Sequence, residues 1–183
     1  MRRTALLLVA LATGLAGCFT VEGTLHADGS GRFHLTYYIQ RHATIPDETR
    51  RLSSEHVHVD SLQGLGDLRA SAEIRFDDVT KLASAETFRR LEVTRTREDD
   101  AESLRVVLRN TFDASQRDAI ARWARENPDR EGPKIALTLP AAVLAANRGA
   151  EVDGARVTWR VRLLEYAGAD RLKFSVRYFL PGS

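Results

Sequence analysis

The sequence lacks the features that define several common classes of enzyme. It has no Gly-rich phosphate loop, no dinucleotide-binding fingerprint and no Gly-x-Ser-x-Gly nucleophile turn. Its paired carboxylates, Asp77-Asp78 and Asp99-Asp100, are adjacent in sequence, and adjacent side chains of a strand point in opposite directions. Neither pair is therefore a natural acid/base couple. We expect a protein that is not an enzyme and needs no cofactor.

Cysteine and excess charge are also scarce. The single cysteine, Cys18, excludes a disulfide within the chain. The formal net charge is only +2, and removal of Arg2 and Arg3 would leave 25 Lys+Arg against 25 Asp+Glu. No basic run interleaved with aromatic residues is present. We therefore expect no nucleic-acid partner.

The N-terminal region holds the one long apolar run. Residues 4–19 carry no charge, but a membrane-spanning helix needs about 20 apolar residues. A basic start, an apolar middle and an end of small residues are the three parts of a secretory signal. The run ends in a motif that resembles the lipobox of bacterial lipoproteins, in which the cysteine is lipidated and the preceding peptide is cut. The motif consists of Leu15, Ala16, Gly17 and Cys18.

This motif predicts where the protein resides and how its chain is divided. We expect residues 1–17 to be a signal peptide that is removed, and residues 18–183 to form a single lipid-anchored domain. Several acyl chains together hold a protein stably on a membrane. The residue after the cysteine is Phe19 rather than aspartate, which by resemblance to sorted lipoproteins favours the outer membrane where an envelope has two. The predicted location is the cell envelope.

Alternating apolar and polar residues predict several half-buried strands. The clearest is 157–163, in which Val157, Trp159 and Val161 face one way and Arg160 and Arg162 the other. The same pattern predicts further strands at residues 33–39, 72–76, 91–93, 104–108, 135–139 and 172–180.

One segment predicts a well-defined helix. Asp113 and Gln116 resemble a capping box, and the helix-favouring residues that follow stop before Pro128. Ile120, Trp123 and Ala124 would form its buried stripe. Residues 46–55 and 80–88 are weaker candidates. We therefore predict an α+β fold, with a curved, mostly antiparallel sheet packed on one main helix and short helical segments.

The first hairpin has two possible registers. A three-residue loop, residues 29–31, would pair Leu25 with Leu35 and Val21 with Ile39, which keeps the apolar faces together. A two-residue loop would mix the faces. We therefore predict the three-residue loop, which would also set His26 opposite His34.

The histidines suggest a metal site that their spacing does not support. His26 and His34 would face each other, and His56-x-His58 adds two imidazoles on one side of a possible strand. No Cys-x-x-Cys or His-Glu-x-x-His motif accompanies them. We interpret them as solvated histidines and expect no metal.

A sheet that curves around helices can enclose an apolar cavity, the usual shape of a lipid-binding site. Its lining would come from the inward faces of the predicted strands. A fully packed core is the alternative interpretation. The candidate lining residues are Tyr37, Leu108, Trp159, Val161, Phe174 and Tyr178.

The opposite face of one strand suggests a second use. Arg156, Arg160 and Arg162 alternate with the apolar residues and would share one face of the sheet. Such a face could dock an envelope protein partner, or it could simply be a solvated exterior.

Several short motifs follow one another along the chain in a recognisable order. The strand 135–139 is followed by Pro-Ala-Ala-Val at residues 140–143, by Asn147 and by the Val-Thr-Trp of residues 157–159. Together with the opening Gly-Cys and the segment 74–79, these motifs resemble the LppM-type family of bacterial envelope lipoproteins.

The resemblance implies an envelope lipoprotein with an α+β domain similar to lipid-binding folds, and a role linked to envelope glycolipids. This chain departs from the pattern in two ways. It adds the strand 172–180 where family members often continue into a transmembrane helix, and Asn147-Arg148 stands where Asn-Gly is usual. The family supplies no catalytic residue to carry over.

Overall fold

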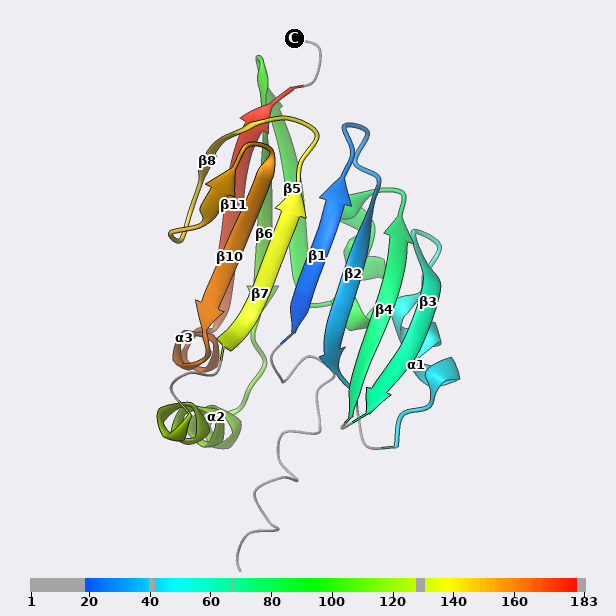
Figure 1. Ribbon diagram of the computed structural model, residues 1–183, viewed down its shortest axis with the longest axis vertical. Helices are drawn as coiled ribbons and strands as arrows, with labels where there is room; N and C mark the ends of the chain where they lie inside the picture. The colour runs from blue at the N-terminus through cyan, green and yellow to red at the C-terminus, as the bar shows by residue number, and fades with distance from the viewer. Residues whose placement is uncertain (1–18, 40–41, 67, 128–130, 181–183) are drawn as a thin grey trace, which may run out of the picture.

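The computed structural model describes residues 19–39, 42–66, 68–127 and 131–180. Within these ranges the chain forms two β-sheets that face each other, with helices at their margins (Figure 1). The predicted α+β class is confirmed. The prediction of one sheet packed on one main helix is wrong, because the strands divide into two sheets and the larger packs mainly on the smaller.

The larger sheet has seven strands and is antiparallel except at its centre, where β1 and β7 run parallel. Parallel neighbours need a long crossover, and here the chain forms most of the smaller sheet before it returns. In order across the sheet, the strands are β3 (Val57–Gly66), β4 (Arg69–Phe76), β2 (Gly31–Tyr38), β1 (Thr20–Leu25), β7 (Glu131–Thr138), β10 (Arg156–Arg162) and β9 (Glu151–Asp153).

The smaller sheet has four strands, all antiparallel. It lies behind β1, β7 and β10 in Figure 1. Its strands in order are β5 (Leu91–Glu98), β6 (Ala101–Arg109), β11 (Arg171–Phe179) and β8 (Val143–Ala146).

The predicted alternation of burial is confirmed in the strands that face the core. In β10, Val157, Trp159 and Val161 are buried while Arg156, Arg160 and Arg162 on the other face are exposed. In β11, Leu172, Phe174, Val176 and Tyr178 are buried in the same way. Both sheets contribute these side chains to one continuous hydrophobic core.

Helical segments cover the part of the larger sheet that the smaller sheet does not cover. The helix α1 (Ile45–Leu52) packs on β3, and two 3₁₀ helices, η1 (Val79–Ser84) and η2 (Glu86–Phe88), complete that side. The second weak helix candidate is thus helical, but as two 3₁₀ turns. At one end of the molecule, α2 (Ala114–Glu126) packs on α3 (Leu163–Gly168) (Figure 1). No helix of the described segments has both the length and the apolar character to cross a bilayer.

The helix α2 confirms its predicted start and, of its predicted buried stripe, Ala124 and the partly buried Ile120 but not Trp123. The side chain of Asp113 accepts from the Gln116 backbone N–H at 2.8 Å, and the Gln116 side chain accepts from the Asp113 N–H at 3.0 Å. Ala124 is buried, but Trp123 is 42% exposed. The prediction for Trp123 is wrong because α2 packs on the short helix α3 at the end of the molecule, which covers a narrower stripe than a sheet would.

The first hairpin forms with a register that differs from the prediction. Leu25 pairs with Gly31 and Val21 with Leu35, a shift of four residues. The loop between the strands is 26–30, closed by a hydrogen bond of 2.8 Å from the His26 N–H to the Ser30 carbonyl oxygen. Because the shift is even, the same residues still face the core.

A packing contact explains this register. A Cβ at Gly31 would lie 2.5 Å from the Phe76 ring and 2.3 Å from the carbonyl oxygen of Thr24. The glycine therefore serves inside β2, where an aromatic ring of β4 lies over it, rather than in the turn. Gly29, with φ of 95°, supplies the left-handed turn position.

Candidate functional site

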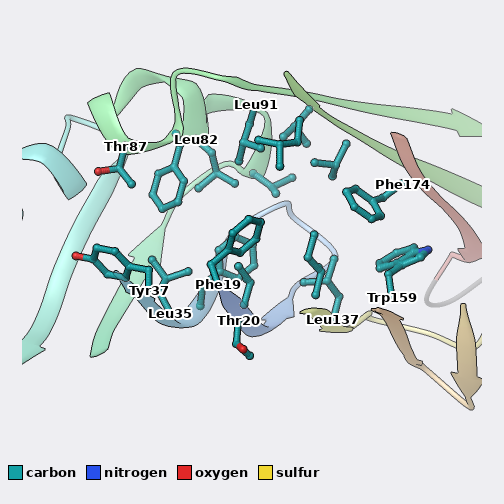
Figure 2. Close-up of a pocket in the computed structure, with 18 of the residues that line it drawn as sticks. Phe19, Thr20, Leu35, Tyr37, Leu82, Thr87, Leu91, Leu137, Trp159 and Phe174 are labelled. Carbon is teal, nitrogen blue, oxygen red and sulfur yellow. The ribbon is translucent and has the colours of Figure 1, made fainter. Parts of the chain in front are cut away.

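An apolar cavity lies between the two sheets of the described residues. Its volume is about 80 Å³, and its surface is almost wholly carbon. Figure 2 shows side chains of the larger sheet on one side and those of η1 and β5 on the other. The lining consists of Phe19, Thr20, Val21, Phe33, Leu35, Thr36, Tyr37, Val79, Leu82, Thr87, Phe88, Leu91, Val93, Leu104, Val106, Leu108, Ile135, Leu137, Trp159 and Phe174.

Two aromatic residues close one end of this cavity (Figure 2). The rings of Trp159 and Phe174 meet edge to face, with centroids 5.7 Å apart. The indole N–H of Trp159 donates to the Asn147 carbonyl oxygen at 3.0 Å, so no polar group of the ring is left buried without a partner. The Arg148 guanidinium lies 5.7 Å from the centroid of the Phe174 ring. These contacts fix both rings as a rigid wall.

Tyr37 and Thr87 lie at the other end (Figure 2). The Tyr37 hydroxyl donates to Glu48 at 3.3 Å, and Glu48 also pairs with Arg51 at 2.7 Å. Burial and the neighbouring Glu48 carboxylate raise the pKa of Tyr37, so its hydroxyl stays protonated at neutral pH. This end of the cavity thus has a polar group behind an apolar surface.

Thr87 carries an unsatisfied polar atom at this end. Its side chain is 8% exposed, and its Oγ1 is the buried side-chain atom of the described residues that has no hydrogen-bond partner. A buried hydroxyl without a partner is unfavourable by about 1–3 kcal/mol. The hydroxyl is the one unpaired donor beside an otherwise apolar lining.

The structure brings together four of the six predicted lining residues. Tyr37, Leu108, Trp159 and Phe174 line the cavity. Val161 and Tyr178 are buried in the core but do not contact it. Val161 lies on the same face as Trp159 but beyond it along β10, and the Trp159 ring closes the cavity before that point.

Tyr178 belongs to a different buried group. Its hydroxyl donates to Glu102 at 2.7 Å, and Arg95 forms an ion pair with the same carboxylate. Burial alone would raise the pKa of Glu102, but hydrogen bonds from Arg95 and Tyr178 outweigh burial and hold it below the ordinary value. Arg95 also donates to the Ala27 carbonyl oxygen at 3.0 Å, which ties the first hairpin loop to the smaller sheet.

Sequence reasoning missed many lining residues, including strand residues such as Leu35 and Val106 and a group that does not lie on long strands. Val79, Leu82 and Phe88 come from the 3₁₀ segments, and Phe19 directly follows the predicted lipidation site. A usable signal was the three-residue spacing of Val79 and Leu82 after Asp78, whose side chain accepts from the Thr80 N–H at 2.8 Å. That pattern marks a capped helical turn with one apolar side.

Two residues of the predicted arginine face, Arg156 and Arg160, line a second, polar hollow of about 300 Å³ on the outside of the larger sheet, whereas Arg162 does not. Lys134 lies 2.7 Å from Glu22, and Arg156 lies 3.7 Å from the same carboxylate. Arg160 lies 3.4 Å from Glu151. The hydrogen bond from Lys134 lowers the pKa of Glu22, so this carboxylate stays ionised. Acidic neighbours therefore offset much of the charge of this face.

The histidines do not gather. The predicted His26–His34 pairing is wrong because Glu22 stands opposite His34, which contacts Glu73 at 2.6 Å. His26 instead contacts the Ser30 hydroxyl in the hairpin loop at 3.0 Å. Over the described ranges, no group of three or more His, Cys, Asp or Glu side chains is placed to hold a metal.

The predicted signal peptide and lipobox, including Cys18, lie outside the described residues. Phe19 is the first residue described, and its buried ring meets the Tyr166 ring edge to face at 6.3 Å. Phe19, the residue next to the predicted lipid attachment, is therefore packed in the core of the domain.

These features define a class: α+β domains in which two facing sheets enclose an apolar hollow. No model of a known protein family matches the sequence, and no curated protein matches it. Among solved structures, the chain is similar to the folded domain of the LppM protein of Mycobacterium tuberculosis, determined by NMR. The match has a TM-score of 0.55 and 14% identity, and it covers 92% of each chain. The chain therefore has an LppM-like fold.

Proposed function

We propose that this protein is a lipid-anchored, non-enzymatic component of a bacterial cell envelope that binds the apolar part of an amphiphile, such as a membrane lipid. The observation that carries the proposal is the apolar cavity between the sheets. The LppM-like fold supports it, since the sequence motifs independently resemble the LppM-type family of envelope lipoproteins.

The size of the cavity indicates which part of an amphiphile it takes. Sites for drug-sized ligands span roughly 300–1,000 Å³, whereas this cavity is about 80 Å³. It suits the end of one acyl chain rather than a whole lipid. Burial of an acyl chain against its apolar surface is favourable by about 25 cal/mol per Å² of apolar area removed from water. The headgroup would remain outside.

The lipid anchor is a separate part of the proposal, and it rests on the sequence LAGC. We expect the mature chain to begin at Cys18, with acyl chains on its sulfur and amino group. Intact-mass measurement of protein extracted from membranes tests this. A product that retains residues 1–17, or that has an unmodified thiol, would contradict the anchor and the envelope location together.

Ligand binding is tested on the full lipidated chain. Purified protein is extracted with organic solvent, and the extract is analysed by mass spectrometry for a co-purifying amphiphile. Val106→Phe adds a ring to a side chain of the cavity lining, so we expect the amphiphile to be lost. Val152→Phe makes the same change at a residue 48% exposed on β9 and should retain it. Equal lipid content in both variants, or none in the parent protein, would contradict binding in the cavity.

The polar hollow of the outer face supports a second proposal, that of a structural or assembly protein which docks an envelope partner. Crosslinking in whole cells tests it, with Arg156, Arg160 and Arg162 each changed to Glu. A stoichiometric protein partner that is lost on charge reversal would favour docking, whereas an unchanged crosslinking pattern would argue against it.

A further inference from the structure

Several strands of the larger sheet begin or end at the same end of the molecule, which we call the anchor end. The register places Thr20, the first residue of β1, opposite Thr36 near the end of β2 and beside Lys134 near the start of β7. Tyr38 at the end of β2 and Gly66 at the end of β3 both pair with Arg69. The helices α2 and α3 lie at this same end (Figure 1).

Large apolar side chains are exposed at the anchor end, and each comes from a different element. Tyr38 ends β2 and is 40% exposed, while Leu65 lies near the tip of the β3–β4 hairpin and is 50% exposed. Trp123 on α2 is 42% exposed and Leu164 on α3 is 47% exposed. Trp and Tyr are enriched at membrane–water interfaces, because their rings combine an apolar body with a polar tip.

Arginines gather at the anchor end, where α2 also carries Asp118 and Glu126 and Arg109 pairs with Glu92. At the anchor end, Arg122 and Arg125 flank Trp123 on α2, and further arginines start or end the strands. These are Arg69, Arg109, Arg162 and Arg171. The opposite end carries acidic turns, which contain Asp28, Asp77, Asp78, Asp99, Asp100 and Asp153. Basic residues near an anionic bilayer surface are attracted by about 1 kcal/mol each.

We propose that the anchor end rests on an anionic bilayer, with Tyr38, Leu65, Trp123 and Leu164 in the interfacial layer and the acidic turns pointing away. The chain outside the structure supports this occupant, because residues 1–18 join the domain at Phe19, on the same end. The inference rests on the lipid anchor of the proposed function but not on ligand binding. The cavity lining includes Phe19, Tyr37 and Leu108, which lie toward this end of the sheets.

The test uses the full lipidated chain in vesicles of equal parts phosphatidylcholine and phosphatidylglycerol. Leu65→Cys and Val152→Cys each add one free thiol for an environment-sensitive fluorophore, since Cys18 is blocked by its lipid. Val152 is the matched control, because it is similarly exposed but lies on β9 beside the acidic Asp153. The label at Leu65 should emit at shorter wavelength and lose most of its quenching by iodide. The label at Val152 should keep the emission wavelength and the iodide quenching that it has without vesicles.

A charge variant gives a second measurement. Arg122→Glu in the Leu65→Cys background should shift the emission back toward its value in water, whereas Arg177→Glu on β11 should not. Equal iodide access at both labels, or shielding at Val152 instead, would overturn the orientation. An extract without amphiphile, combined with a shielded Leu65 label, would refute the cavity proposal alone. Lipid-loaded protein with two exposed labels would refute the orientation alone.

Discussion

At the scale of single residues, the buried charges and hydroxyls decide how the structure responds to pH and substitution. Glu102 is 4% exposed and depends on Arg95 and Tyr178 to keep its charge. Removing one partner of a buried pair leaves the other charge uncompensated, which is unfavourable by about 3–5 kcal/mol. A pair at the surface contributes at most about 1 kcal/mol.

Glu102→Gln should lower the free energy of unfolding by about 3 kcal/mol at pH 7. The folded pKa of Glu102 lies below its ordinary value of 4.5. Its ionised form therefore stabilises the fold above about pH 4.5, and this contribution disappears as the pH falls through the folded pKa. The gap between the parent protein and the variant in urea unfolding should close over that window. Glu22→Gln should change stability by less than about 1 kcal/mol, and a gap that does not depend on pH would contradict the assignment.

Thr87→Val should raise the free energy of unfolding by about 1 kcal/mol, because it removes a buried hydroxyl that has no partner. Thr80→Val is the matched control of opposite sign, since the Thr80 hydroxyl donates to Asp78 at 2.8 Å. Thermal unfolding of the two variants measures both effects. A loss of stability in Thr87→Val would show that its hydroxyl has a protein partner.

At the scale of elements, the β1–β2 hairpin shows how packing sets a strand register. The apolar faces of both strands follow from alternation, and an even shift leaves those faces unchanged. The choice between even registers depends on a contact with a third strand, namely the Phe76 ring over Gly31.

Gly31→Ala should lower the free energy of unfolding by about 2 kcal/mol, because the new methyl group would overlap a backbone oxygen as well as the Phe76 ring. Gly64→Ala on β3 meets no atom within 4 Å. That change should be neutral or slightly stabilising, since alanine is less costly than glycine in a strand. Equal denaturation midpoints for the two variants would rule out the packing explanation for the register.

Local patterns predicted most elements of this fold. Alternation placed β10 and β11, and the Asp113–Gln116 box placed the start of α2, because each signal lies within a few neighbouring residues. The division into two sheets could not be predicted, because the inward faces of β6 and β7 are equally apolar and alternation does not say which strands pair. The exposure of Trp123 likewise depends on where α2 docks, which its own sequence does not encode.

At the scale of the whole molecule, both sheets share one core, with Trp159 of the larger sheet against Phe174 of the smaller. The lining of the cavity could be predicted in part, because alternation shows which strand residues face inward. The hollow itself could not, since it depends on how closely side chains from nine helices and strands meet.

The shared core predicts that the two sheets unfold together. In Trp123→Phe, Trp159 is the remaining tryptophan and reports on the interface between the sheets. Its fluorescence and the far-UV circular dichroism should follow one urea transition with the same midpoint. Two separate midpoints would show that the smaller sheet unfolds independently.

The central place of β1 in the larger sheet has a mechanical consequence. Tension applied through the N-terminus pulls this strand along its own axis, while β2 and β7 hold it from both sides. Ladder hydrogen bonds lie across the direction of such a pull, so they share the load instead of opening one after another. A domain that is pulled from its N-terminus should thus need a larger force to unfold when its first strand is central than when that strand lies at the edge of a sheet.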